Sequence, residues 1–200
     1  MVYRILQPLV KLFLLLFFRL KSSGQEHLPS GGCVIASNHM SLLDPPVIGC
    51  SLPVSRGIHF MAKQELFKIP IFSWIIAHLG AFPVRRGMSD RNAIRTAIDL
   101  LRSGEIVGMF PEGTRSSTGQ LGKALPGMAM LAVKAGVPVV PAAIVGTDKA
   151  FSRGCLFPAV TARFGPPIIL PAGRTERENI EFLTNTIMEE IARLLEQEGG

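Results

Sequence analysis

Short apolar runs alternate with stretches of helical periodicity from residue 33 to the C-terminus, and this alternation most limits the fold. Cys33–Ala36 and Glu105–Phe110 are short apolar runs of the kind that form strands. Between such runs lie stretches with apolar residues at helical spacing, the clearest of them from Ser89 to Arg102. Strands that alternate with helices pack as a central sheet covered by helices. The sequence therefore predicts an α/β sandwich with a largely parallel or mixed central sheet.

The remaining elements follow from the same patterns. We expect further strands at 58–63, 81–84, 137–145 and 159–164, and helices at 66–79, 123–135 and 175–197. Asp44 is expected to cap a helix whose first residue is Pro45. Pro138 and Pro141 indicate an edge strand or a bulge, because proline cannot donate a hydrogen bond to a ladder. The polar, Gly-rich residues 21–32 are expected to form a linker.

The N-terminal segment is apolar but carries basic residues. Its uninterrupted apolar run, Leu12–Phe18, is much shorter than the ~20 residues that a helix needs to span a bilayer. The residues that follow contain no convincing A-x-A cleavage site, which a signal peptide would show. A helix in the membrane interface fits this pattern, although a core-packing helix fits the composition equally well. We therefore expect a membrane-associating helix in residues 1–22 and one domain in residues 23–200.

Charge and composition limit the partners. The chain has 21 Lys and Arg against 15 Asp and Glu, a formal net charge of +6. A basic surface attracts nucleic acid, anionic lipid or small phosphates. Aromatic residues make up 7% of the chain and do not interleave with basic residues as in a base-stacking platform. We therefore expect no nucleic acid as a partner, and the mean hydropathy of +0.34 favours an anionic membrane surface.

The cysteines and histidines predict no metal site. Cys33, Cys50 and Cys155 lie far apart in the sequence, without metal-ligand or redox spacing. Scattered thiols in odd number are typical of a reducing compartment. The other histidines bear no spacing relation to His39 that would complete a ligand set.

His39 and Asp44 are the candidate catalytic pair. A histidine can act as a general base near neutral pH, and a carboxylate on its second ring nitrogen fixes the tautomer. The two side chains can meet only if residues 40–43 form a turn, because positions i and i+5 diverge on a regular helix. Taken alone, such a pair is more often a turn histidine beside a helix cap. A Ser-His-Asp hydrolase would need a G-x-S-x-G turn, which the sequence lacks.

Three segments supply candidate phosphate contacts. In Phe110–Ser116, Gly113 permits close approach of a ligand and Arg115 offers a fork suited to phosphate oxygens. Arg85 and Arg86 directly follow an expected strand. Lys63 is a third candidate cation. Each segment also has a plainer interpretation, either a surface turn with an internal ion pair or a solvated basic residue.

Together these blocks resemble the 1-acylglycerol-3-phosphate acyltransferase family, the bacterial lysophosphatidate acyltransferases. The blocks stand in the family's order over roughly residues 25 to 170: Asn38–Asp44, Gly80–Gly87, Phe110–Ser116 and Val137–Pro141. The second block usually carries one arginine before its glycine, whereas this chain has two. The N-terminal segment is shorter than the two-helix element of some relatives.

The resemblance implies a glycerolipid-acyltransferase-like fold with an N-terminal membrane-interface helix. It implies that His39 is the general base, oriented by Asp44. It also implies an acceptor site for lysophosphatidic acid, built from Lys63, Arg85 or Arg86, Glu112, Gly113, Thr114 and Arg115. The acyl donor would be a thioester of coenzyme A or acyl carrier protein, with no further cofactor. The product would be phosphatidic acid, made at the cytoplasmic face of the cell membrane for phospholipid biosynthesis.

Three alternatives remain open at the level of sequence. A related acyltransferase could act on glycerol 3-phosphate or on another lysolipid. A non-catalytic protein could bind anionic lipid through its basic faces. An esterase would release free fatty acid to water and would need no acceptor.

Overall fold

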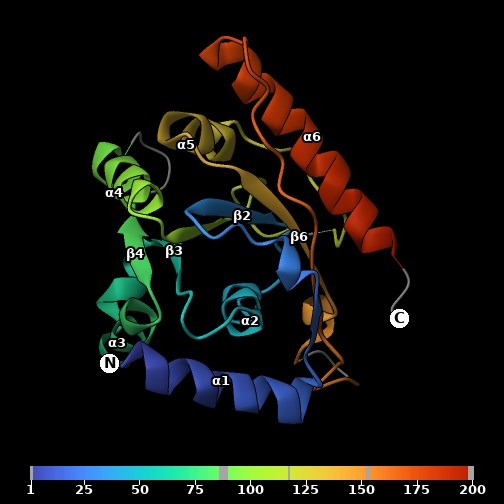
Figure 1. Cartoon of the computed structure of the whole chain (residues 1–200). Coiled ribbons are helices and arrows are strands. Elements are labelled where there is room, and N and C mark those ends of the chain that lie inside the picture. Colours follow the sequence, from blue (N-terminus) through green and yellow to red (C-terminus); the bar gives the residue numbers. More distant parts are fainter. Residues whose placement is uncertain (1, 86–89, 117, 152–153, 198–200) are drawn as a thin grey trace.

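A layer of strands lies between two layers of helices in the computed structural model (Figure 1). The structure describes residues 2–85, 90–116, 118–151 and 154–197. The strands of these residues are β1 (Lys21–Ser23), β2 (Cys33–Ser37), β3 (Ile58–Lys63), β4 (Ala81–Val84), β5 (Ile106–Met109), β6 (Val139–Val145) and β7 (Thr161–Phe164). The α-helices are α1 (Tyr3–Phe18), α2 (Asp44–Ser51), α3 (Pro70–His78), α4 (Arg91–Arg102), α5 (Gly127–Ala135) and α6 (Glu176–Glu196).

The described strands form one sheet in the order β1-β7-β6-β2-β5-β3-β4. The pairs from β6 through β2, β5 and β3 to β4 are all parallel, whereas β7 runs antiparallel to β6. The predicted α/β sandwich with a largely parallel or mixed sheet is therefore confirmed. Because the parallel strands run in one direction, the residues that follow β2, β3, β4, β5 and β6 all lie at the same edge of the sheet.

The alternation of side chains along each strand divides the core in two. In β2, Cys33 and Ile35 pack toward α1 and α2, while Val34 and Ala36 pack toward α4, α5 and α6. The second of these clusters takes Leu183, with Ile187 and Ile191, from α6. These strands are apolar on both faces because helices cover both faces.

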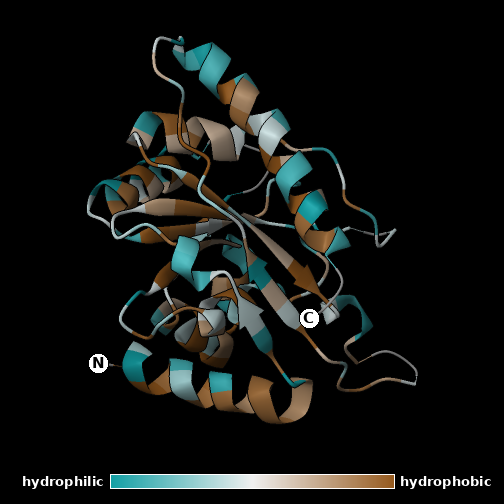
Figure 2. Ribbon diagram, turned by 45° about the vertical axis from the view of Figure 1, so that its right-hand side comes forward, coloured by the Kyte–Doolittle hydropathy of each residue, from teal (hydrophilic) through white to brown (hydrophobic). Residues whose placement is uncertain are grey.

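The N-terminal helix α1 packs on α2 and the sheet through one stripe. Leu14 and Phe18 are buried in the first cluster, and the Gln7 amide donates hydrogen bonds to the carbonyls of Gly49 and Leu52. Most outer side chains of α1 are apolar and exposed, and Figure 2 shows α1 along the bottom of the molecule as a mainly hydrophobic ribbon with hydrophilic bands. Among the described residues, no helix is long and apolar enough to cross a membrane.

The expected linker, residues 21–32, contains the edge strand β1. Its residues Lys21, Ser22 and Ser23 pair in parallel with Thr161, Ala162 and Arg163 of β7. All three residues of β1 are exposed and polar, so the sequence shows no apolar alternation that would predict a strand here. Polar residues are typical of a sheet edge, where they discourage pairing with another chain.

The prolines of β6 indicated an edge strand or a bulge; the strand is interior, so the edge alternative is wrong. It lies between β7 and β2. The Pro141 carbonyl accepts a hydrogen bond from the Gly165 amide, and Gly165 follows the last residue of β7. A side chain on Gly165 would come within 2.9 Å of the Pro141 ring. The proline therefore sits where the neighbouring strand ends and glycine leaves room for its ring.

Candidate active site

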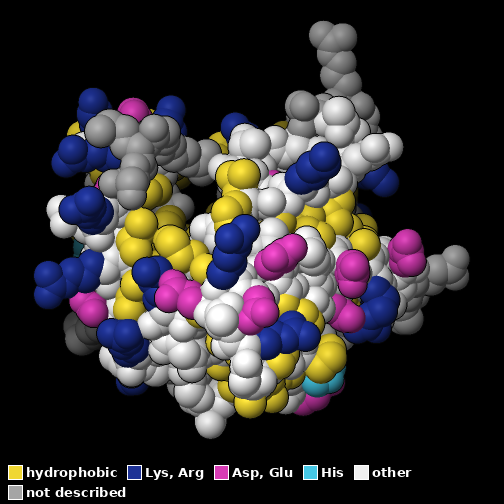
Figure 3. All heavy atoms as spheres, turned by 90° about the horizontal axis from the view of Figure 1, so that it is seen from above, with side chains coloured by type: hydrophobic (Ala, Val, Ile, Leu, Met, Phe, Trp, Pro, Cys, Tyr) yellow, Lys and Arg dark blue, Asp and Glu magenta, His cyan; other side chains and the backbone are white. Residues whose placement is uncertain are grey.

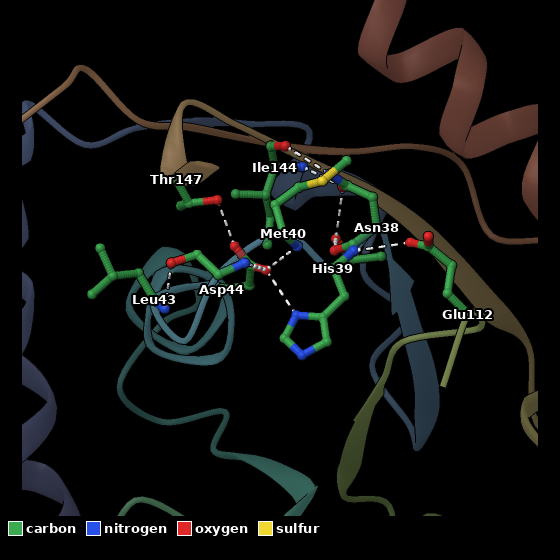
Figure 4. Close-up of polar contacts among 10 residues, drawn as sticks. Asn38, His39, Met40, Leu43, Asp44, Glu112, Ile144 and Thr147 are labelled. Atoms are coloured by element: carbon green, nitrogen blue, oxygen red, sulfur yellow. Dashed lines mark hydrogen bonds and ion pairs between the residues drawn. The ribbon is translucent and has the colours of Figure 1, made fainter. Parts of the chain in front are cut away.

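His39 and Asp44 meet at the edge of the sheet where the parallel strands end. His39 lies two residues beyond β2, and Asp44 is the first residue of α2. The Nδ1 atom of His39 is 2.8 Å from Oδ2 of Asp44 (Figure 4). The residues between them form the expected turn, closed by a hydrogen bond from the Asp44 amide to the Ser41 carbonyl. Open α/β sheets place their binding sites at this edge.

The carboxylate of Asp44 fixes the tautomer of His39. Asp44 is fully buried, and an ionised carboxylate can only accept hydrogen bonds. Nδ1 of His39 therefore carries the hydrogen, and Nε2 keeps a free lone pair. Figure 4 shows Nε2 pointing away from Asp44. The pair thus has the arrangement that a general base requires.

Asp44 does not cap α2, contrary to the expectation from sequence. Leu43 occupies the N-cap position, and no side chain caps the helix there. The Asp44 carboxylate instead reaches back along the chain, where Oδ2 accepts the amide hydrogens of Met40 at 2.6 Å and Ser41 at 2.7 Å. The aspartate therefore organises the turn that presents His39, rather than the first turn of the helix.

Thr147 supplies the fourth donor to Asp44. Its hydroxyl donates to Oδ1 at a distance of 2.6 Å, and both residues are buried. Thr147 comes two residues after β6, so the topology of the sheet brings it to the same edge as His39. Sequence reasoning missed this residue. The only signal available in the sequence was a hydroxyl just beyond an expected strand.

One face of the His39 imidazole packs against an aromatic ring. It stacks on Phe110 with the ring centroids 3.9 Å apart and the planes inclined by 12°. His39, Phe110 and Gly113 line a small cavity of about 140 Å³ together with Val84. The ends of β2, β4 and β5 therefore border one space next to His39.

Glu112 contacts the turn that carries His39 through backbone amides. Its Oε1 accepts the amide hydrogen of His39 at 3.1 Å, and its Oε2 accepts that of Gly122 at 2.8 Å. The His39 carbonyl in turn accepts the amide hydrogen of Ser116 at 2.8 Å. The segment that contains Glu112 is thus hydrogen-bonded to both the backbone amide and the backbone carbonyl of His39.

Two candidate cations, Lys63 and Arg85, lie at the same edge of the sheet, and neither is among the described residues that line the cavity beside His39. Lys63 ends β3 and pairs with Glu65 at 3.9 Å, an exposed contact of little energetic weight. Arg85 follows β4, and its side chain lines a cavity of about 500 Å³ together with Lys68. Arg86 lies outside the described residues.

Asp90 fixes the backbone at Arg85. Its carboxylate accepts the amide hydrogen of Arg85 at 3.0 Å and that of Ala93 at 3.2 Å, and it caps α4. These two hydrogen bonds hold the pKa of Asp90 below its ordinary value, with that from Arg85 contributing most. One carboxylate therefore joins the end of β4 to the start of α4.

Gly113, Thr114 and Arg115 follow Glu112 in an exposed turn. Gly113 has a φ of +71°, a conformation that favours glycine. Of the predicted acceptor residues, the structure brings Glu112 and Gly113 next to His39. Thr114 and Arg115 lie on the surface directly beyond them.

An apolar cavity of about 260 Å³ lies between α1, α2 and α3. Pro45, the residue after Asp44, lines it, as do Phe60 and Ile75. Phe60 stacks 5.9 Å from Phe110, so two aromatic rings separate this cavity from His39. Gly108 makes room for Phe60, since a side chain there would overlap the ring at 2.2 Å. The cavity is apolar and lies close to the turn that carries His39 and Asp44.

Comparison with protein families agrees with this geometry. A family model described as Acyltransferase matches residues 19–145, more than half of the chain. The chain belongs to the acyltransferase family. The matched range contains both members of the His39–Asp44 pair, together with Glu112.

Curated relatives of this chain include plant and bacterial proteins. It is 37% identical over 142 residues to the chloroplastic 1-acyl-sn-glycerol-3-phosphate acyltransferase BAT2 of Brassica napus, covering 69% of this chain and 40% of the relative. It is 36% identical over 148 residues to the 1-acyl-sn-glycerol-3-phosphate acyltransferase of Bacillus subtilis, covering 74% and 73% respectively. The chain thus spans less than half the length of the plant relative and most of the bacterial one.

A solved structure shares the fold of this acyltransferase. The crystal structure of the 1-acyl-sn-glycerophosphate (LPA) acyltransferase PlsC from Thermotoga maritima matches with a TM-score of 0.76 and 29% sequence identity. The match covers 99% of this chain and 81% of the other. The expected acyltransferase-like sandwich is therefore confirmed over nearly the whole chain.

Proposed function

We propose that this acyltransferase transfers a fatty acyl group from a thioester to the sn-2 hydroxyl of 1-acylglycerol 3-phosphate, giving phosphatidic acid. The observation that carries the proposal is the buried His39–Asp44 pair, because His39 lines a cavity that Val84 and Gly113 of the predicted acceptor segments also border. The names of the Brassica and Bacillus relatives supply the acceptor. The donor is a thioester of coenzyme A or of acyl carrier protein.

The mechanism follows from the position of the proton on His39. Nε2 removes the hydroxyl proton of the acceptor as the oxygen attacks the thioester carbonyl, so a C–O bond forms and the carbonyl becomes an oxyanion. Collapse of this intermediate breaks the C–S bond, and the imidazolium returns its proton to the leaving thiolate. Asp44 stabilises the imidazolium between these steps. General-base help of this kind is typically worth about 10²–10⁴-fold.

The apolar cavity and the exposed arginines suggest how the substrates are placed. The apolar cavity between α1, α2 and α3 suits an acyl chain, because its wall is almost entirely hydrocarbon. Arg85 and Arg115 suit the phosphate of the acceptor, because a guanidinium matches the geometry of phosphate oxygens. Glu112 and Gly113 shape the turn that leads to Arg115. The acceptor is a membrane lipid, and the exposed apolar side of α1 suits peripheral attachment at the cytoplasmic membrane face.

An acceptor screen tests this function. Labelled acyl-CoA and acyl carrier protein thioesters are offered with lysophosphatidic acid, glycerol 3-phosphate, lysolipids with head groups, or no acceptor. Phosphatidic acid should form with lysophosphatidic acid and not with His39→Ala. The matched control is His27→Ala, since His27 contacts the Phe164 carbonyl and lies outside the site. Free fatty acid without an acceptor, or full turnover by His39→Ala, would refute the proposal.

A further inference from the structure

The helix α3 is apolar, yet none of its residues is buried. Its sequence, PIFSWIIAH, contains no Asp, Glu, Lys or Arg. Ile71 is 79% exposed and Trp74 is 51% exposed, and Ile69, directly before the helix, is also exposed. Single exposed apolar residues are ordinary, but a contiguous patch of them marks an interaction surface. The outer face of α3 is such a patch.

The outer face of α1 continues this patch on the same side of the sheet. Leu9, Leu12 and Leu16 are exposed there, while the inner stripe of the helix packs on the core. The two helices face each other across the apolar cavity, to which α1 contributes Val10 and α3 contributes Ile75. Figure 1 shows α3 beside the N-terminal end of α1. A helix that is apolar on all sides belongs in a protein core or in lipid.

Charges border this patch and match an anionic lipid surface. Lys68 precedes α3, and Arg4 and Lys11 lie on α1. The nearest acidic residue before α3, Glu65, is paired with Lys63. The opposite side of the molecule differs, because Figure 3 shows charges of both signs spread between apolar side chains there. Apolar residues with flanking cations favour the interface of a membrane that contains anionic lipid.

We propose that α3 inserts Ile71 and Trp74 into the membrane interface and forms one lipid-facing surface with α1. The purpose of this surface rests on the proposed function, because the acceptor is a membrane lipid. Leu42 and Phe72 line the apolar cavity and are also exposed, so the cavity reaches the surface beside α3. Insertion of α3 therefore lets an acyl chain move between the bilayer and the cavity without crossing water.

Trp74 reports directly on this insertion, since it is the only tryptophan in the chain. The full chain is mixed with vesicles of phosphatidylcholine and phosphatidylglycerol. Its emission should move to shorter wavelength, and phosphatidylcholine brominated near the head of its acyl chains should quench it. Sedimentation with the vesicles measures binding independently. Binding without a spectral shift or quenching would leave the contact to α1 alone and overturn the proposal.

A matched pair of variants separates α3 from general surface hydrophobicity. Ile71→Ser should weaken vesicle binding by about tenfold or more, as expected for an isoleucine that leaves lipid. Ile169→Ser is the control, since Ile169 is 74% exposed but lies beside Ile168, which packs on the α4–α6 side. Equal binding by the two variants would refute the role of α3. A spectral shift that depends on protein concentration without lipid would identify a second copy as the occupant instead.

Activity assays separate this proposal from the proposed function. Ile71→Ser should lose transfer to long-chain lysophosphatidic acid in vesicles but keep transfer to a short-chain, monomeric acceptor. If the unaltered protein acylates neither acceptor, the proposed function fails, while the Trp74 measurement still tests insertion. If Ile71→Ser loses activity on both acceptors, its defect is not one of membrane contact and the proposal fails.

Discussion

Glu112 holds the backbone of His39, because its Oε1 accepts the His39 amide hydrogen at 3.1 Å. Its second oxygen accepts the amide hydrogen of Gly122 at 2.8 Å. One buried carboxylate therefore ties the catalytic turn to the loop that follows Gly113. The resemblance to acyltransferases implies an acceptor-binding role for Glu112. From these contacts we infer, in addition, that Glu112 positions His39.

Glu112→Gln should lower kcat more than it changes KM for the acceptor. A glutamine offers one acceptor oxygen, so its NH₂ group faces one of the two amide donors. An unsatisfied buried donor costs about 1–3 kcal/mol. The displaced histidine should then slow transfer by on the order of ten- to a hundredfold. Steady-state kinetics with both substrates varied measure the two effects separately.

Gly122→Ala is the companion to this variant, because a side chain at 122 would come within 2.9 Å of the Glu112 carboxylate. It leaves the charge of Glu112 intact but pushes on its position, so it should also lower kcat. Gly119→Ala is a poor control for Gly122→Ala, since Gly119 has a positive φ of 76°. Gly127→Ala is a better control, since a side chain there meets nothing within 4 Å. A raised KM with unchanged kcat in Glu112→Gln would assign Glu112 to substrate binding alone.

Thr147→Val should reduce both stability and kcat. Valine keeps the shape of threonine but removes the hydroxyl that donates to Asp44 at 2.6 Å. A hydrogen bond to a charged group contributes about 1.5–3 kcal/mol, so the free energy of unfolding should fall by that order. Thr147→Ser keeps the donor and should retain most of the activity. Urea unfolding and kcat are the measurements, and equal kcat in the two variants would remove Thr147 from the site.

The strands of the core could be predicted because each is a short apolar run. The run at Ile58–Lys63 and that at Ala81–Val84 coincide with β3 and β4. β1 could not be predicted, since its three polar residues form a strand only through pairing with β7. The interior position of β6 depends on Gly165, which makes room for Pro141 from another part of the chain.

The site was predictable where neighbouring residues form it. The turn between His39 and Asp44 follows from their spacing, and the structure has it. The contact of Asp44 with Thr147 joins residues that are 103 positions apart, and only the order of the strands brings them together. Helix capping by Asp44 was a wrong prediction for a related reason, since the Met40 and Ser41 amides compete for the same carboxylate.

Asp90→Ala should raise KM for the acceptor by freeing the backbone of Arg85. The carboxylate of Asp90 holds the Arg85 amide at 3.0 Å, and Arg85 is a proposed phosphate contact. Arg85→Ala should raise KM by about tenfold or more, as for a lost charge-assisted hydrogen bond. Asp90→Ala should do the same to a smaller extent. Asp99→Ala, on the same helix and paired only at the surface with Arg95, is the control.

The carboxylate of Asp90 makes the stability of the fold depend on pH in a defined direction. The pKa of Asp90 is lowered in the folded protein, chiefly by the hydrogen bond from the Arg85 amide. The contribution of Asp90 to stability is therefore complete above the ordinary aspartate pKa of about 3.9, and it is lost as pH falls through the lowered pKa. Thermal unfolding from pH 6 to pH 3 should show a smaller loss of Tm in Asp90→Ala than in the unaltered protein. An equal loss in both would contradict this role.

Two of the three thiols should resist labelling in the folded protein. Burial raises the pKa of the Cys33 thiol to about 11 and that of the Cys50 thiol to about 12. Since only the thiolate reacts, at pH 8 Cys50 would present about one reactive form in ten thousand. Cys155 is half-buried and should label first. Intact mass and peptide mapping after timed exposure to iodoacetamide should show one fast site, absent in Cys155→Ser.

Cys50 adds a test of the apolar cavity, because it lines this cavity whereas Cys33 lies in the sheet. A small apolar maleimide at higher pH should label Cys50 slowly, and a bound long-chain acyl ligand should slow that reaction further. Labelling of Cys33 under the same conditions should not respond to the ligand, so it serves as an internal control. Equal protection of both thiols would indicate general stabilisation of the fold. Protection of Cys50 alone would place the chain between α1, α2 and α3.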